Sequence, residues 1–561
     1  MHIKSFNERS LSAVVTVLFI ASLVLRIFIG IDLTDEMQYY LQILGMVETN
    51  SLFSNDLYIQ QLVYLLFYPF FKLYYTLIGD TGLVVFGRSL YAFCLIGLYI
   101  FSNRILCRVG INPLVSSVAA FALCFAPSFA GIFAINYNTI SQFGWCIITL
   151  IIAFQVNVSS LFWAVIICLT GLAHPPGGIA LASICAFMHL ITSDTNKLCR
   201  IISLTVLITV ITIVLVAWLS GGLEQLHRAF LFTKGFSAGD TFFEIDSLIN
   251  IGIVIFLLIF SIFFPAFKRA SIPLIVFSLL FGFVCIFIIL AQRAELTNIG
   301  IWGFSYNINI LKLWLIFSIV YIYTARCVCS DSEEVNSIMK RLVYISIVQL
   351  IVLTGTSSNG VNYIIGALVI LLPIVAALPA FKKPFIKNRT ITILPVITVL
   401  IWVLSLMVYY PYRQVPINNT ERGLSNVPMF SGLFLNKTIL DFSDGLRNEI
   451  SYLIKGSPGM IISNIPGVYP ILGVRPSTCM LYNHSLGTQS AAALLADCLI
   501  DREMLFVAHF HSNETNFNEL RKHKLLHTIA NLRSLKCDNH RLELPSAAPN
   551  HFTHTILTLC D

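Results

Sequence analysis

The feature that most constrains this chain is a succession of apolar runs, each about 13–21 residues long, that continues from the N-terminus to about residue 410. Runs of this length cross a bilayer as helices, because a helix satisfies its own backbone hydrogen bonds. Only 11% of the residues are Asp, Glu, Lys or Arg, against roughly a quarter in soluble domains, so a soluble fold is excluded. Glycine and proline follow no period, which excludes fibrous, disordered and solenoid classes. The sequence therefore predicts an α-helical, polytopic membrane protein.

The apolar runs predict about 13 transmembrane helices. The first, Leu11–Ile31, follows two basic residues and lacks a cleavage site, which indicates an uncleaved helix with a cytoplasmic N-terminus. The later candidates are Leu83–Asn103, Pro113–Phe133, Ile140–Val156, Leu161–Ala173, Ile179–Ile191, Ile201–Ser220, Ile251–Phe264, Ile272–Ala291, Ile308–Tyr323, Leu342–Thr354, Val361–Pro379 and Thr390–Tyr409.

Basic residues fall in every second loop except the uncharged link Gln155–Ser160, as expected for the cytoplasmic side of a membrane protein. They account for the net charge of +7 without a nucleic-acid partner, and we expect none. The alternation predicts a transmembrane domain over residues 1–410, with an acidic first exterior loop at 32–80. Residues 411–561 are predicted to form a small exterior α/β domain. Leu57–Leu77 would invert the alternation if it crossed, so we expect it to lie as a helix along the outer face.

Four cysteines, Cys479, Cys498, Cys537 and Cys560, lie in the predicted exterior domain. An even number in an oxidising compartment predicts at least one disulfide, with three connectivities open. Their wide spacing disfavours a metal site.

The most informative polar motif is the acidic loop after the first helix, in which Asp35 and Glu36 precede Tyr39 and Tyr40. Neighbouring carboxylates at a membrane surface can take a proton from a hydroxyl or hold a divalent cation. The alternative is that Asp35 and Glu36 only cap the helix that begins there.

Other candidate binding residues lie in later exterior loops. Asn136 and Asn138 offer amide groups to a sugar, although ordinary loop chemistry would also use them. His174 stands in a proline- and glycine-rich break between two helices, where it either contacts phosphate or belongs to a tight turn. Arg293 and Lys312 flank one loop, and they either bind a phosphate or extend to lipid headgroups.

The layout resembles the GT-C superfamily of integral membrane glycosyltransferases, in particular the branch with protein O-mannosyltransferases and lipid A aminoarabinose transferases. The resemblance covers the whole chain. The features that carry it are Asp35-Glu36 with Tyr39-Tyr40 after the first helix, the interfacial Leu57–Leu77 segment, the Gly171–Gly178 break, and about 13 spans before an exterior domain.

The resemblance implies a glycosyltransferase that moves a sugar, with inversion, from a polyprenyl-phosphate donor to a hydroxyl of an exterior glycan, lipid or protein. Asp35 would be the base and Glu36 its neighbour in the site, and Tyr39 and Tyr40 would bind substrate beside them. A divalent cofactor is left open. The chain also resembles glucosyltransferases that modify bacterial O-antigen in lipopolysaccharide, which implies a bacterial inner membrane with the C-terminal domain in the periplasm. A polysaccharide polymerase or flippase and a secondary transporter are the alternatives.

Overall fold

The computed structural model describes residues 8–219 with short gaps at 34, 54–58, 126–131 and 192–193. It also describes 333–354, 370–381, 421–475 without 455–459 and 464, three later strands, and a few positions within 224–229 and 396–401. The predicted spans between residues 251 and 323, and with them Arg293 and Lys312, lie outside the described residues.

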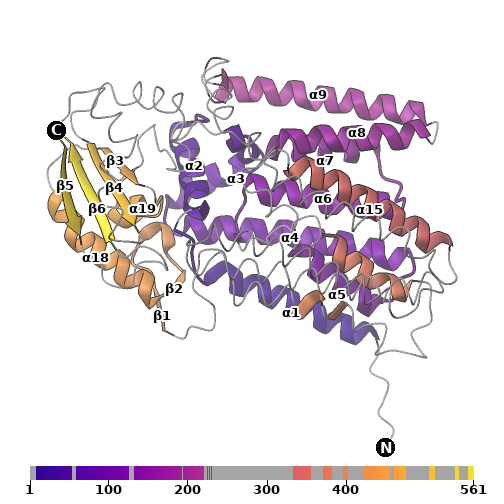
Figure 1. Cartoon of the computed structure of the whole chain (residues 1–561), viewed down its shortest axis with the longest axis horizontal. Coiled ribbons are helices and arrows are strands. Elements are labelled where there is room, and N and C mark those ends of the chain that lie inside the picture. The colour runs from indigo at the N-terminus through magenta and orange to yellow at the C-terminus, as the bar shows by residue number, and fades with distance from the viewer. Residues whose placement is uncertain are drawn as a thin grey trace, which may run out of the picture.

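Helices lying side by side form the main body of the molecule (Figure 1). Three described helices are long and apolar enough to cross a membrane: α1 (Glu8–Phe28), α4 (Leu83–Arg108) and α9 (Thr195–Leu219). Beside them lie α5 (Pro113–Cys124), α6 (Tyr137–Ala153), α7 (Ser160–Ala173), α8 (Pro175–Ile191) and α15 (Glu333–Thr354). Large apolar side chains such as Val17 and Trp218 point outward from α1 and α9, as expected for lipid contact. The prediction of a helical membrane protein is confirmed at this level.

The ends of these helices follow from local sequence signals. Asn112 caps α5, whose first residue is a proline, by accepting a hydrogen bond from the Leu114 N–H at 3.0 Å. Ser159 caps α7 in the same way. Between α7 and α8 the break predicted from prolines and glycines is present. A Cβ on Gly178 would lie 2.5 Å from the Gly171 Cα, so glycine lets the two helices meet at their backbones.

The segment predicted as one interfacial helix over Leu57–Leu77 is helical but broken. It consists of a 3₁₀ helix, η1 (Ile59–Leu66), followed by α3 (Tyr68–Ile78). Pro69 stands in the first turn of α3, where its ring cannot continue a preceding helix. Both pieces pack against α2 (Asp35–Thr49), the helix that carries the acidic pair.

The C-terminal region, residues 421–560, combines helices with strands. A short antiparallel pair, β1 (Arg422–Leu424) and β2 (Phe434–Asn436), precedes α18 (Lys437–Ile454). A second sheet has the order β3-β4-β6-β5, with β3 (Met460–Ser463) parallel to β4 (Leu505–His511) and the other pairs antiparallel. Its remaining strands are β5 (Cys537–Leu542) and β6 (His554–Cys560), and α19 (Val468–Leu472) follows β3. The boundary at residue 411 lies outside the described residues and stays a prediction.

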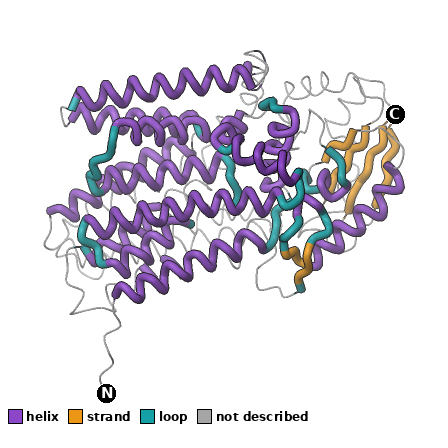
Figure 2. The backbone as a smooth tube through the Cα atoms, turned by 180° about the vertical axis from the view of Figure 1, so that it is seen from behind, coloured by secondary structure: helices purple, strands orange, loops and turns teal. Residues whose placement is uncertain are grey.

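The C-terminal region sits at the end of the helix bundle where α2 and α3 lie, and both views show it there (Figures 1 and 2). The Gly30 N–H donates to the Phe434 carbonyl at 3.1 Å, and the Gly82 N–H donates to the Pro428 carbonyl at 2.9 Å. The acidic loop and the C-terminal region therefore share one end of the bundle. The side of the membrane that this end faces stays a prediction.

Candidate functional site

The acidic motif lies at the start of α2, which is buried along most of its length. All residues from Glu36 to Val47 are buried, whereas Asp35 at the first position is half-buried. The consecutive carboxylates thus differ in environment, since neighbouring residues on a helix point in different directions.

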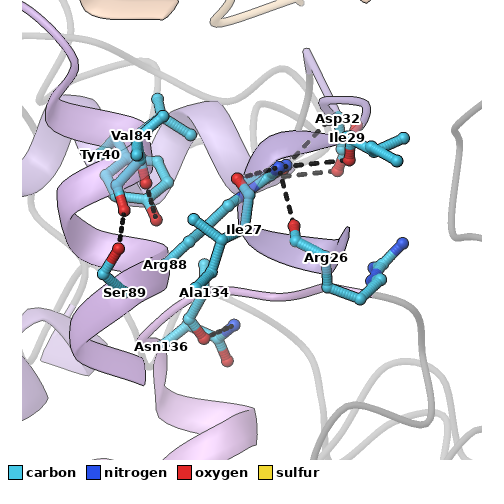
Figure 3. A network of polar contacts seen from close by, with 12 residues as sticks. Arg26, Ile27, Ile29, Asp32, Tyr40, Val84, Arg88, Ser89, Ala134 and Asn136 are labelled. Atoms are coloured by element: carbon cyan, nitrogen blue, oxygen red, sulfur yellow. Dashed lines mark hydrogen bonds and ion pairs between the residues drawn. The ribbon is translucent and has the colours of Figure 1, made fainter. Parts of the chain in front are cut away.

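Glu36 forms a bidentate ion pair with Arg88 of α4. Arg88 Nε donates to Glu36 Oε1 at 2.7 Å, and a terminal Arg88 nitrogen donates to Oε2 at 2.8 Å. The Glu36 side chain is 0% exposed and the Arg88 side chain is 1% exposed. The other terminal nitrogen of Arg88 contacts the carbonyls of Arg26, Ile27 and Ile29 at 3.2–3.3 Å, where α1 ends (Figure 3). Arg88 therefore joins the ends of α1 and α2, and the predicted supporting carboxylate is held by a partner within the protein.

Asp32 and Glu36 also bond each other reciprocally. The Glu36 N–H donates to Asp32 Oδ2 at 3.2 Å, and the Asp32 N–H donates to Glu36 Oε2 at 3.1 Å. Each backbone N–H donates to the carboxylate of the other residue, which resembles the reciprocal bonding of a capping box. The sequence left open a capping role for Asp35 and Glu36; the structure shows these capping bonds for Glu36 with Asp32.

Tyr39 and Tyr40 are both buried behind the acidic pair. Tyr40 donates to the Val84 carbonyl at 3.2 Å, and its ring lies so close to Gly87 that a Cβ there would collide with it. Burial, together with the nearby Glu36 carboxylate, raises the pKa of Tyr40 well above its usual value, so its hydroxyl stays protonated. The Tyr39 ring meets Tyr137 edge to face, with ring centroids 6.3 Å apart, which links α2 to the start of α6.

Asn136 is buried and caps α6. Its side-chain oxygen accepts from the Thr139 N–H at 2.9 Å, while the Thr139 hydroxyl accepts from the Asn136 N–H at 3.1 Å. The Asn136 oxygen is thus used by the fold, whereas Asn138 is half-buried in the first turn of the same helix. A sugar contact by either residue stays a prediction.

His174 lies between α7 and α8. Its Nδ1 accepts a hydrogen bond from the Gly177 N–H at 3.0 Å, which requires that nitrogen to be unprotonated. Burial lowers the pKa of His174 to about 4, so the ring is neutral at pH 7. In this structure its Nδ1 caps α8, and a phosphate contact by the neutral ring stays a prediction.

Two arginines near the acidic loop, Arg88 and Arg26, are buried in the structure, and neither was predicted from the sequence as a site residue. Arg88 lies within the predicted span Leu83–Asn103, and the signal that could have paired it with Glu36 is the rarity of charges within spans, which favours mutual neutralisation. Arg26 is also buried, and its guanidinium carbon lies 5.7 Å from the centroid of the Phe133 ring.

The interfacial segment holds α2 along its length through polar side chains that interrupt its apolar pattern. Tyr64 donates to Gln42 Oε1 at 3.1 Å, and Tyr75 donates to Glu48 Oε1 at 2.9 Å. Lys72 Nζ donates to the Val47 carbonyl at 2.6 Å, which places a cation at the C-terminal end of α2.

A cavity of about 380 Å³ opens at the opposite end of the bundle, near the ends of α4 and α6 and the start of α15. Glu333, Glu334 and Arg341 line it. It lies at the end predicted to be cytoplasmic, away from the acidic loop. No three His, Cys, Asp or Glu side chains gather as metal ligands among the described residues.

No protein-family model matches the chain, and no curated protein matches it. Among solved structures, the chain is similar to ArnT from Cupriavidus metallidurans, whose crystal structure holds undecaprenyl phosphate. The match covers 97% of both chains at 11% identity, with a TM-score of 0.45. A likeness this loose does not allow residues of ArnT to be assigned to positions of this chain.

Proposed function

We propose that this protein is a membrane glycosyltransferase that moves a sugar from a polyprenyl-phosphate donor to a hydroxyl of an exterior glycan, lipid or protein. The observation that carries the proposal is the contrast within the acidic pair. Glu36 is sealed in a bidentate ion pair, while Asp35 next to it is half-buried at the end of the bundle that faces the C-terminal region. The resemblance of the sequence to GT-C enzymes supports the same assignment.

The chemistry requires one carboxylate at the surface of the site. A hydroxyl is a weak nucleophile at neutral pH, so a base must take its proton as its oxygen bonds to the anomeric carbon of the sugar. The bond from that carbon to the lipid phosphate breaks, and the phosphate leaves with the electron pair. Asp35 is proposed as this base. Glu36 supports it indirectly, because its bonds to Arg88 and Asp32 fix the first turn of α2.

Donor recognition needs cationic groups for the phosphate, and Arg293 and Lys312 remain the proposed ones. Arg88 is less suitable, since its guanidinium contacts Glu36 and three backbone carbonyls. The proposed setting is the bacterial inner membrane with the C-terminal region in the periplasm, and O-antigen is the proposed acceptor class.

The test replaces Asp35 by Asn, which keeps the shape of the side chain and removes the base. Transfer from lipid-linked sugar in proteoliposomes should fall about 100-fold or more, while donor binding persists. Asp441→Asn is a matched control, because Asp441 is an exposed aspartate on α18. A well-folded Asp35→Asn protein that transfers sugar at the normal rate would remove the main support for the proposal. The donor itself can be identified from the lipid-linked sugar that accumulates when the protein is deleted.

A further inference from the structure

One short stretch of the C-terminal region, residues 467–475, contacts both ends of α2. At the start of the stretch, the Gly467 N–H donates to the Leu33 carbonyl at 2.7 Å. Leu33 lies one residue after Asp32 and two before Asp35. This hydrogen bond therefore holds Leu33, which stands between the two aspartates in the sequence.

The approach of Gly467 to Leu33 leaves no room for a larger residue. A Cβ on Gly467 would lie 2.7 Å from Leu33 Cδ2, 2.8 Å from Leu33 Cβ and 3.0 Å from the Leu33 oxygen. The φ angle of Gly467 is −60°, which any residue adopts. Glycine is thus needed here for close contact with the acidic loop rather than for its backbone freedom.

At the other end of the stretch, Arg475 joins two carboxylates of the first loop. Its Nε lies 3.0 Å from Glu48 Oε1, in the last turn of α2, and a terminal nitrogen lies 2.8 Å from Asp80 Oδ2. Between the two contacts, the Ile471 carbonyl accepts from Arg447 Nε at 2.7 Å, which ties α19 to α18. The stretch is therefore anchored in the C-terminal region while it holds α2 at both ends.

We propose that the 467–475 stretch positions the acidic loop for sugar transfer, with Gly467 and Arg475 as positioning residues. The expected effect on the transfer rate rests on the proposed function, whereas the contacts themselves do not. Moving a reacting group by about 1 Å can reduce a rate about 100-fold without loss of the fold. The Arg475 contacts are partly exposed and contribute little to stability, so they can be broken without unfolding the protein.

The test uses Gly467→Ala, which pushes on Leu33, and Arg475→Ala, which releases Glu48 and Asp80. Both should lower kcat about 10-fold or more and leave the donor KM unchanged, because neither Gly467 nor Arg475 is a proposed donor contact. Arg475→Lys keeps the charge and one contact, so it should recover part of the rate. Gly97→Ala is the matched control, since a Cβ there meets nothing within 4 Å. If Gly467→Ala fails to fold, the two Arg475 variants decide the question.

A second measurement separates this inference from the proposed function. Hydrogen exchange in nanodiscs should be faster across residues 29–40 in Gly467→Ala and Arg475→Ala, and unchanged in Gly97→Ala. This readout remains valid if the wild-type protein transfers no sugar, in which case only the proposed function fails. Wild-type exchange in both variants would overturn the positioning role, whatever their rates. Faster exchange with a normal kcat in an active enzyme would overturn it as well.

Discussion

Two arginine–glutamate pairs hold opposite ends of α2, and they differ mainly in their surroundings. Arg88 and Glu36 at the N-terminal end are 1% and 0% exposed, with a shortest distance of 2.7 Å. Arg475 and Glu48 at the C-terminal end are 48% and 24% exposed, at 3.0 Å. The first pair lies among the helices of the bundle, whereas the second crosses to the C-terminal region.

The comparison shows that burial determines how much each of two chemically similar ion pairs contributes to stability. Removing one member of a buried pair leaves a charge without water or partner, which destabilises the fold strongly. Removing one member of an exposed pair leaves a charge that water solvates, so the free energy of unfolding changes little. We therefore expect the Arg88–Glu36 pair to be needed for the folding of the site. We expect the Arg475–Glu48 pair to affect mainly the position of the acidic loop.

The largest effect should come from Arg88→Ala, which strands Glu36. We expect a loss of about 3–5 kcal/mol in stability, seen as a fall in the thermal midpoint of the detergent-purified protein. Replacing both partners, as Arg88→Met with Glu36→Met, should recover much of the loss because neither member of the pair is then left buried without the other. A midpoint for Arg88→Ala equal to that of Arg475→Ala would show that burial does not separate the two pairs.

The next effect concerns how the C-terminal region is held together. The register of β5 and β6 places Cys537 opposite Cys560, so among the connectivities left open by the sequence we expect a disulfide between these two residues. Thiol labelling of the denatured protein should reach both residues only after reduction, and reduction should cost about 2–4 kcal/mol of stability. The exposed free thiol of Cys199 serves as the positive control for labelling. Labelling of Cys537 and Cys560 without reduction would exclude the disulfide.

A smaller effect should appear on acidification, through His174. Its pKa is about 4 in the folded protein against 6.5 for the ordinary side chain, so the unfolded state binds the proton first. The contribution of His174 to the free energy of unfolding should be complete above about pH 6.5. It should fall by up to about 3 kcal/mol as the pH approaches 4. His174→Asn removes the titrating group and should flatten this part of the profile. An equal slope in both proteins would assign the acid sensitivity to other groups.

The smallest effect should come from a pair more exposed than Arg475 and Glu48. Lys437 and Glu421 lie 3.3 Å apart and are 64% and 70% exposed. Lys437→Ala should change stability by less than about 1 kcal/mol and leave the transfer rate unchanged. A drop as large as that of Arg88→Ala would mean that the C-terminal region depends on surface charge in a way that its exposure does not predict.

The sequence alone determined what depends on solvent and on local backbone chemistry. Long apolar runs can only be stable in a bilayer, prolines and glycines end helices near 112 and 174, and an acidic pair after the first span is visible without coordinates. The break at Pro69 could have been read in the same way, because proline acts on its own neighbours.

Only the tertiary structure decided which polar groups pair with one another. Glu36 and Arg88 are 52 positions apart, and Leu33 and Gly467 are far more distant in the chain, so no local pattern links them. Partners at such separations are chosen by the packing of whole helices, which brings the end of α1, the start of α2 and the side of α4 together. The sequence thus indicated the carboxylates, whereas the fold decided that Glu36 is sealed inside while Asp35 stays half-buried at the surface. The physical reason is that burial is a property of the assembled structure, and burial determines what a carboxylate can do.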